Sequence, residues 1–179
     1  MTVVAAQQED VEALARVHVQ AWRESYAGLI PDAVLAALDP IERAGMWARI
    51  IGAGECVLLA RDEAGALLGF IAAGPQRESD LPFAGEIGAL YLLDAAKRRG
   101  LGRALMRAAA TYMLARGMGS ASLWVLDGNL PAIAFYAALG GRVVANRALP
   151  ARRAWVGRET AYAWDDLRRL IPNFEIKDR

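Results

Sequence analysis

A short basic segment, Lys97-Arg98-Arg99-Gly100-Leu101-Gly102-Arg103, constrains the fold of this 179-residue chain more than any other feature. It follows an apolar, strand-like run at residues 87–93 and precedes a helix-like run at residues 101–116. Two glycines permit a tight turn that brings several backbone N–H groups close to one point. The start of the following helix adds unpaired donors and a partial positive charge. The segment therefore predicts a strand, a turn and a helix that together bind a phosphate-rich ligand.

Two common phosphate-binding motifs do not fit this segment. Arg103 and Ala104 follow Gly102, so the lysine and the hydroxyl residue of a P-loop are absent. Leu105 stands where a dinucleotide-binding loop needs its third glycine. Spacing alone leaves a second interpretation open, in which the segment is an ordinary turn with solvated basic side chains.

A second segment, residues 125–140, also has the pattern of a strand, a turn and a helix. It contains Asn129 and Phe135-Tyr136, and the expected helix ends at Leu139-Gly140. Together, the two segments resemble the acetyl-coenzyme-A-binding half of the GNAT superfamily of N-acetyltransferases. The family's loop has Gln or Arg, then two residues, Gly, one residue, and Gly or Ala. Its second pattern is an Asn followed by a helix that carries Phe-Tyr and closes at Leu-Gly.

The resemblance is specific over residues 85–141, the expected acetyl-CoA-binding half, and weaker over residues 11–51. Two positions depart from the family pattern. Lys97 stands where Gln or Arg is usual, which keeps a polar side chain and the charge of Arg. Gly141 stands where an aromatic residue often follows the helix-ending glycine, so we expect looser packing there.

Composition limits the classes of protein to which the chain can belong. Its length suits one domain over residues 1–179, and an apolar content of 55% is ample for a core. Lys plus Arg number 21 and Asp plus Glu number 20, so the formal net charge of +1 argues against a general nucleic-acid binder. Neither a membrane-spanning run nor a signal peptide is recognisable, and we expect a cytoplasmic protein with no membrane partner.

Cys56 and His18 are each the sole residue of their type. A single cysteine cannot form an intrachain disulfide or a cysteine-based metal cluster. Cys56 lies in an apolar run, which favours a buried structural thiol over a nucleophile. His18 lies beside Val17 and Val19 on an expected helix face, which favours a packed or partly exposed side chain over a catalytic one. No spacing of His, Asp and Glu predicts a metal site.

Hydrophobic periodicity predicts an α/β chain with a mixed sheet of about six or seven strands flanked by helices. The expected strands are residues 2–6, 55–61, 66–73, 86–93, 120–126, 142–148 and 154–164. The expected helices are residues 10–26, 31–38, 40–51 and 101–116, with a further helix that is capped by Asn129 or Asp127 and ends at Leu139. The strand-helix-strand unit over residues 86–126 requires a parallel strand pair.

The resemblance implies where acetyl-CoA binds. In the family, two parallel strands separate at their C-terminal ends and the pantetheine arm enters the gap, so the strands ending at Leu93 and Leu126 are expected to separate here. The backbone N–H of Leu92 is then the expected oxyanion donor, because it needs no side chain. The expected coenzyme-binding residues are Leu92, Lys97, Arg98, Arg99, Gly100, Leu101, Gly102, Arg103 and Asn129.

Two side chains are candidates for proton transfer. The resemblance, together with the pKa of about 10 for a phenol, identifies Tyr136 as the acid that protonates the departing thiolate; the alternative is a core tyrosine. Glu86 precedes Lys97 by eleven residues, a spacing that resembles the catalytic glutamate of the family's histone-acetylating branch. It is the candidate base, and the alternative is an exposed glutamate with no role.

By resemblance, residues 9–51 form the acceptor side, with Trp22, Glu24 and Tyr26 as candidate substrate-binding residues. The predicted function is direct transfer of acetyl from acetyl-CoA to a primary amine of a small molecule, peptide or protein, without a metal. The alternative is a module that binds acyl-CoA without turnover. The oligomeric state stays open, because Trp155 and Trp164 suit either a homodimer interface or the core.

Overall fold

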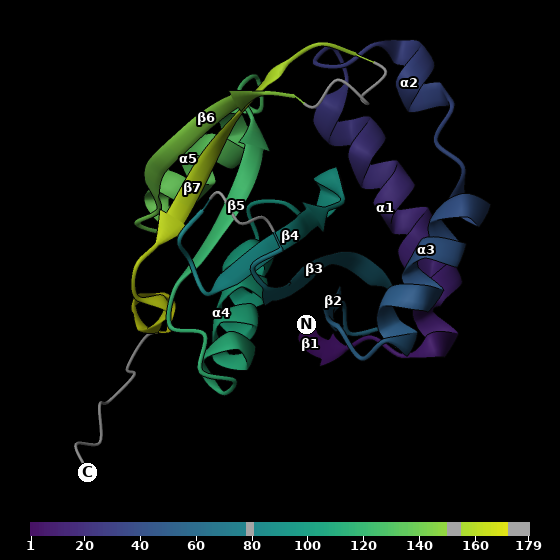
Figure 1. Ribbon diagram of the computed structural model, residues 1–179. Coiled ribbons are helices and arrows are strands. Elements are labelled where there is room, and N and C mark those ends of the chain that lie inside the picture. The colour runs from purple at the N-terminus through teal and green to yellow at the C-terminus, as the bar shows by residue number, and fades with distance from the viewer. Residues whose placement is uncertain (78–80, 150–154, 172–179) are drawn as a thin grey trace.

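One mixed β-sheet organises the molecule (Figure 1). This computed structural model describes residues 1–77, 81–149 and 155–171, and within them seven strands lie in the order β1-β2-β3-β4-β5-β7-β6. The strands are β1 (Thr2–Ala5), β2 (Cys56–Arg61), β3 (Leu67–Pro75), β4 (Gly85–Leu92), β5 (Ala121–Leu126), β6 (Arg142–Ala148) and β7 (Arg158–Trp164). The helices are α1 (Val11–Tyr26), α2 (Asp32–Ala36), α3 (Pro40–Gly52), α4 (Leu101–Leu114) and α5 (Leu130–Ala138), with 3-10 turns η1 (Gln8–Asp10), η2 (Asp94–Ala96) and η3 (Leu167–Leu170). The predicted mixed sheet is confirmed.

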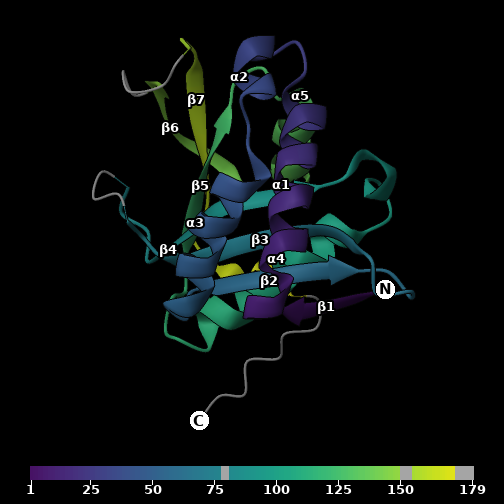
Figure 2. The ribbon, with the colours of Figure 1, turned by 90° about the vertical axis from the view of Figure 1, so that its right-hand side faces the viewer.

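Helices cover both faces of this sheet through separate apolar clusters. On one face, α1 and α3 bury Leu14 and Trp47 against Phe70 of β3. On the other face, α4 buries Leu105 and Met106. Figure 2 shows α1 and α3 in front of the sheet and α4 behind it. Within the described residues, no helix is long and apolar enough to cross a membrane.

The strands β4 and β5 are parallel neighbours that separate almost at once, as the resemblance implied. Only Gly85 with Ala121 and Glu86 with Ser122 are paired. Further along, β4 continues to pair with β3 on its other side, as far as Leu92. The register between β3 and β4 shifts between Ala72 and Ala73, which leaves Gly88 as an extra residue in β4. The edge of β4 that faces β5 is therefore open over its second half.

The last strand is shorter than the periodicity predicts. β7 begins at Arg158, whereas a strand was expected over residues 154–164, of which residue 154 lies outside the described residues. Val156 is 99% exposed, so its apolar side chain does not pack against the sheet. Gly157, which follows it, has a low preference for strands.

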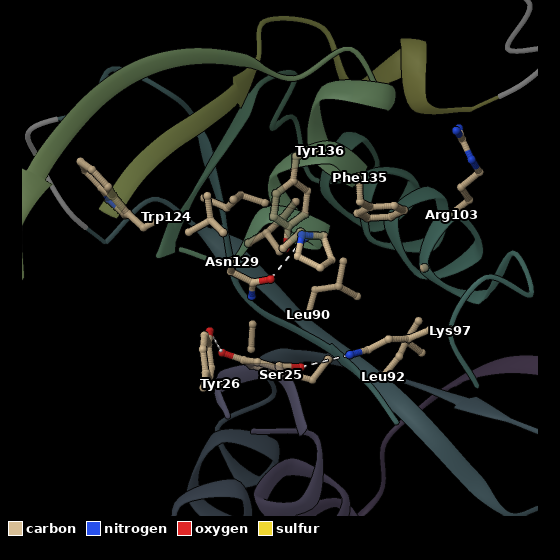
Figure 3. A pocket seen from close by; sticks show the side chains of 18 of the residues that line it. Ser25, Tyr26, Leu90, Leu92, Lys97, Arg103, Trp124, Asn129, Phe135 and Tyr136 are labelled. Carbon is tan, nitrogen blue, oxygen red and sulfur yellow. Dashed lines mark hydrogen bonds between the residues drawn. The ribbon is translucent and has the colours of Figure 1, made fainter. Parts of the chain in front are cut away.

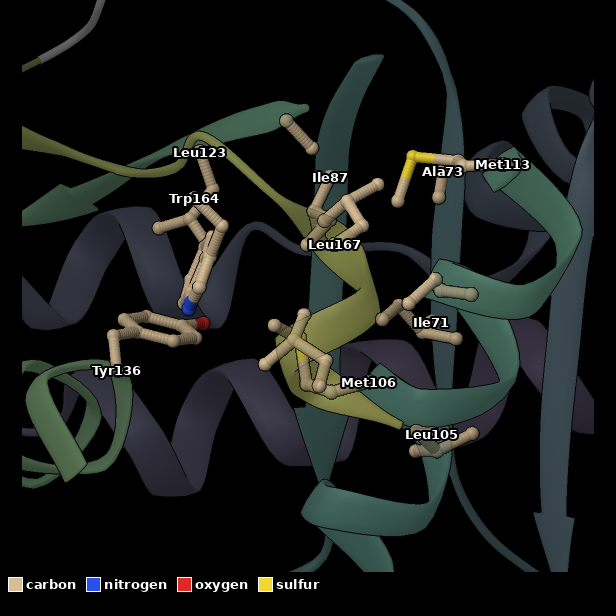
Figure 4. Packing of buried hydrophobic residues seen from close by; sticks show 14 of the residues in the cluster. Ile71, Ala73, Ile87, Leu105, Met106, Met113, Leu123, Tyr136, Trp164 and Leu167 are labelled. Atoms are coloured by element: carbon tan, nitrogen blue, oxygen red, sulfur yellow. The ribbon is translucent and has the colours of Figure 1, made fainter. Parts of the chain in front are cut away.

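Tight packing surrounds Gly141, contrary to the expectation of looser packing at this position. A Cβ on Gly141 would lie 2.8 Å from Cζ2 of Trp164 and 2.9 Å from the carbonyl oxygen of Tyr136. The Trp164 indole is 3% exposed, and its Nε1 donates to the carbonyl oxygen of Leu139 at 2.9 Å. Trp164 therefore fills the space beside the α5 terminus and packs edge-on against Tyr136 (Figure 4). It belongs to the core of this chain.

We expect Gly141→Ala to lower the free energy of unfolding by about 1–3 kcal/mol, because the added methyl overlaps the Trp164 ring. Gly119→Ala is the matched control, since nothing lies within 4 Å of a Cβ there and its φ is not in the left-handed region. Urea unfolding measures both variants. Equal stability of the two variants would contradict the packing described here.

His18 is buried in the cluster between α1, α3 and the sheet, 6% exposed. The indole Nε1 of Trp47 donates to its Nδ1 at 3.1 Å, so Nδ1 carries no proton. Burial, followed by the positive charge of Arg43, lowers the pKa of His18 from 6.5 to about 3. The expected packed role is confirmed, and His18 stays neutral at physiological pH. Cys56 is buried as expected, and burial raises the pKa of its thiol to about 11.

The neutral state of His18 makes stability depend on pH. In the unfolded chain His18 takes up a proton near pH 6.5, whereas in the folded protein it does so only near pH 3. Protonation therefore favours the unfolded chain, so the folded protein is most stable above pH 6.5 and loses stability as the pH falls towards 3. We expect the free energy of unfolding to drop by about 2 kcal/mol between pH 7 and pH 5. Since His18 is the single histidine, His18→Gln should remove most of this slope. An unchanged slope in urea titrations of the variant would refute this assignment.

Candidate active site

A cavity of about 430 Å³ occupies the gap between β4 and β5. Its walls come from β4, the loop at residues 97–103, β5, α5 and the end of α1. We call this space the coenzyme cavity, after the ligand that the resemblance implies. Figure 3 shows Leu90 and Leu92 on one side of it, with Tyr136 and Phe135 opposite and Lys97 towards one end. Segments distant in sequence thus meet where the parallel strands separate.

The loop before α4 has the conformation that its glycines predict. Gly100 has φ 81° and is the N-cap of α4, while Arg98 also adopts a positive φ of 59°. A non-glycine residue in this region is uncommon and is often found at functional sites. The first helical hydrogen bond runs from the amide of Ala104 to the carbonyl oxygen of Gly100. The backbone N–H groups before Ala104 thus have no carbonyl acceptor within the helix, which suits them to bind an anion.

The residues of the loop differ in whether they line the cavity. Lys97, Arg98, Gly100, Gly102 and Arg103 line the cavity. Leu101, in contrast, is 4% exposed and packs in the core, so it can contribute only through its main chain. Arg99 is exposed outside the lining.

Two loop residues are held by their neighbours. The ammonium of Lys97 pairs with Asp94 at 2.6 Å and donates to Ser25 Oγ at 3.4 Å, which draws it towards the end of α1. Gly102 lies under Phe135, and a Cβ there would approach that ring to 3.0 Å. The second glycine therefore lets α4 and α5 approach each other beside the cavity.

The open edge of β4 supplies main-chain groups to the cavity. The amide of Leu93 donates to Leu68 of β3 at 3.0 Å. Because successive backbone amides along a strand point to opposite edges, the amide of Leu92 faces the gap. Left unpaired when buried, such a group costs about 1–3 kcal/mol, so the gap favours a ligand with amide groups of its own.

Tyr136 projects from α5 into the same cavity and is 7% exposed. Burial, and then the nearby Tyr26, raise the pKa of its phenol far above the ordinary value. Its hydroxyl therefore keeps its proton at neutral pH. Asn129 also lines the cavity, and its Oδ1 accepts from the amide of Ala132 at 3.3 Å. Asn129, not Asp127, thus caps α5; the Asp127 carboxylate instead accepts from Thr160 Oγ1 at 2.7 Å.

Glu86 lies outside the coenzyme cavity, in a second cavity of about 250 Å³. The carboxylate pairs with Nη2 of Arg77 at 2.7 Å and its side chain is 13% exposed. The second cavity adjoins the first, because Tyr26, Tyr91 and Trp124 line both. We call this second space the acceptor cavity.

The three candidate residues of α1 separate into two groups. Trp22 and Tyr26 line the acceptor cavity. Glu24 lines neither cavity, and its carboxylate accepts from the amide of Asp94 at 2.7 Å, which ties α1 to η2. Tyr91 and Trp124 were not singled out from the sequence, since both lie in apolar strand-like runs where an aromatic residue is ordinary. Trp155, whose role was open, is half-buried beside the acceptor cavity.

These features define a class of site. A helix terminus with unpaired amides, an open strand edge and a protonated phenol lie along one cavity. Among the described residues, no group of three or more His, Cys, Asp or Glu side chains is arranged to hold a metal ion. Such a site suits a ligand with a diphosphate at one end and an acyl group at the other.

Comparisons with known proteins agree with this class. The model of the acetyltransferase (GNAT) family matches residues 16–140, and the chain belongs to that family of N-acetyltransferases. An uncharacterised N-acetyltransferase of Bacillus subtilis, YuaI, is 35% identical over 170 residues, which cover 95% of this chain and 96% of YuaI.

Solved structures show the same fold at lower identity. A ribosomal-protein-alanine N-acetyltransferase from Brucella melitensis has a TM-score of 0.71 at 18% identity, over 92% of this chain and 99% of that one. A PaiA N-acetyltransferase from Thermoplasma acidophilum, solved in complex with coenzyme A, has a TM-score of 0.69 at 19% identity, over 91% and 98% of the two chains.

Proposed function

We propose that this protein transfers the acetyl group of acetyl-CoA directly to a primary amine, within a complex that holds both substrates. The observation that carries the proposal is the shape of the β4–β5 gap. The loop at residues 97–103 and Tyr136 both line this gap, and three of its other lining residues, Tyr26, Tyr91 and Trp124, also line the acceptor cavity. Residues 85–141 would hold the coenzyme, while residues 9–51 would contribute to the acceptor side.

Binding of the coenzyme would rely mainly on the main chain. The diphosphate would accept hydrogen bonds from amides between Arg98 and Arg103, with basic side chains around it. The pantetheine arm would lie along β4 and satisfy its open edge. Asn129 would hold the arm or a water molecule while it caps α5. No metal takes part in this scheme.

The proposed reaction has three steps. The ammonium of the acceptor loses a proton, which Glu86 takes through water, since the carboxylate lies in the acceptor cavity. The neutral nitrogen attacks the thioester carbon, and the Leu92 amide donates to the oxygen that becomes negative. The C–S bond then breaks, and the phenol of Tyr136 donates its proton to the departing sulfur. The nitrogen, which carries an extra proton after the attack, gives that proton to the Tyr136 phenolate, and Glu86 releases its proton to solvent. The products are an acetamide and free coenzyme A.

The decisive experiment is release of free thiol from acetyl-CoA by the purified protein in the presence of an amine panel. Mass spectrometry should find an acetylated amine in amounts equal to the thiol released. Tight binding of acetyl-CoA with no turnover on any amine would instead favour a module that binds acyl-CoA. Thiol release without an acetylated amine would indicate hydrolysis and contradict the proposal.

A further inference from the structure

Two tyrosine hydroxyls meet where the coenzyme cavity joins the acceptor cavity. Tyr26 ends α1 and Tyr91 lies in β4, and their hydroxyl oxygens are 2.9 Å apart. Both residues line both cavities. Figure 3 shows Tyr26 across the gap from Asn129, with a hydrogen bond drawn at its hydroxyl. The pair therefore lies where the two cavities meet.

Tyr91 is the fixed member of the pair. Its ring stacks on His18 with centroids 5.4 Å apart, and it lies opposite Phe70 in the β3–β4 register. His18 is itself held by the indole N–H of Trp47. This row of buried rings leaves the Tyr91 side chain little freedom, so its hydroxyl defines where that of Tyr26 can lie.

Tyr91 keeps its proton at neutral pH. Burial, and then the neighbouring Tyr26, raise the pKa of Tyr91 well above the ordinary value for a phenol. The Tyr91 phenol is therefore not suited to take a proton from an ammonium. A hydroxyl can, however, donate one hydrogen bond and accept others. When Tyr91 donates to Tyr26, the Tyr26 oxygen is oriented to accept from an N–H group.

We propose that Tyr26 accepts a hydrogen bond from the acceptor amine, and that Tyr91 is a positioning residue that orients the Tyr26 hydroxyl. A neutral primary amine has two N–H groups, so it can donate one to Tyr26 and still direct its lone pair at the thioester carbon. A tertiary amine has no N–H to donate. The proposal rests on the N-acetyltransferase function above and adds the group that orients the nucleophile.

The test compares Tyr26→Phe, Tyr91→Phe and the double variant with the wild type. Its acceptor is whichever of L-lysine, spermidine, benzylamine and the dipeptide Ala-Ala the wild type acetylates fastest. Each single variant should lower kcat/KM for the amine about tenfold, because a hydrogen bond to the nucleophile is lost or misdirected. The double variant should lose no more than Tyr26→Phe alone, since residues that act as one unit are not additive. The Kd of acetyl-CoA should stay within about twofold of the wild type.

Tyr112→Phe is the matched control. Tyr112 lies on α4, lines neither cavity and carries the guanidinium of Arg116 over its ring at 3.7 Å. Its kinetics should equal those of the wild type. Thermal melting of every variant separates a loss of stability from a loss of rate.

Three results would overturn the proposal while leaving the proposed function intact. Unchanged kcat/KM in Tyr26→Phe would show that the amine does not use this hydroxyl. Losses that multiply in the double variant would show that Tyr91 does not act through Tyr26. A lower melting temperature in Tyr91→Phe with intact kinetics would make Tyr91 purely structural. Absence of turnover by the wild type on every amine would refute the proposed function itself, and this inference with it.

Discussion

Changing both Arg98 and Arg99 to Glu is expected to weaken acetyl-CoA binding by about 100-fold or more. Both side chains are exposed beside the start of α4, so the fold should tolerate the change. Two positive charges near a bound diphosphate become two negative ones, while the backbone amides remain. Calorimetry on the folded variant measures the Kd. The defect should shrink as salt is added, because exposed charges are screened.

The matched control reverses Arg168 and Arg169, an adjacent pair in η3 that lines neither cavity. It alters the net charge equally and should leave the Kd of acetyl-CoA unchanged. If both double variants bind alike, the loop does not hold the diphosphate, and the proposed mode of coenzyme binding is wrong.

Tyr136→Phe is expected to lower kcat by about 100-fold, the usual contribution of a well-placed general acid. The Kd of acetyl-CoA should change little, because the ring and its packing against Trp164 remain. Burial raises the pKa of Tyr136, so its proton is present throughout neutral and mildly alkaline solution. The wild type should therefore show no loss of rate from this group as the pH rises from 7 to 9. Steady-state kinetics across that range provide the measurement.

Tyr162→Phe is the control for removing a buried hydroxyl nearby. Its ring centroid is 6.2 Å from that of Tyr136, it is equally buried, and it lines neither cavity. We expect near-normal kcat for this variant. Full activity in Tyr136→Phe would mean that the thiolate leaves without this acid.

Local chemistry made the loop before α4 and the start of α5 predictable. Glycine adopts backbone conformations that other residues avoid, so Gly100 and Gly102 between a strand and a helix predict a tight turn, and the structure shows a left-handed conformation at Gly100. Asn129 before Pro131 marks a helix start in the same way, and its side chain caps α5. Such signals lie within a few residues of one another, so they can be recognised without knowledge of the fold.

The acceptor side was less predictable, because its residues come together from separate elements. Glu24 looked like its neighbours Trp22 and Tyr26, yet it binds the amide of Asp94 instead of lining a cavity. The partner of Glu86, Arg77, lies just beyond the end of β3, and sequence spacing did not indicate that pair. Tyr91 carried no signal of its own, since an aromatic residue in a buried strand is ordinary.

The strand–loop–helix that presents unpaired amides could be predicted from the sequence, because backbone conformation there depends on neighbouring residues. The same segment predicts the class of ligand. Which side chains meet across the gap depends on the tertiary structure. The hydroxyls of Tyr26 and Tyr91 are sixty-five positions apart and lie 2.9 Å from each other. Trp164 likewise fills the space that Gly141 leaves. Both contacts depend on how the sheet brings α1, β4 and β7 together, which no local pattern encodes.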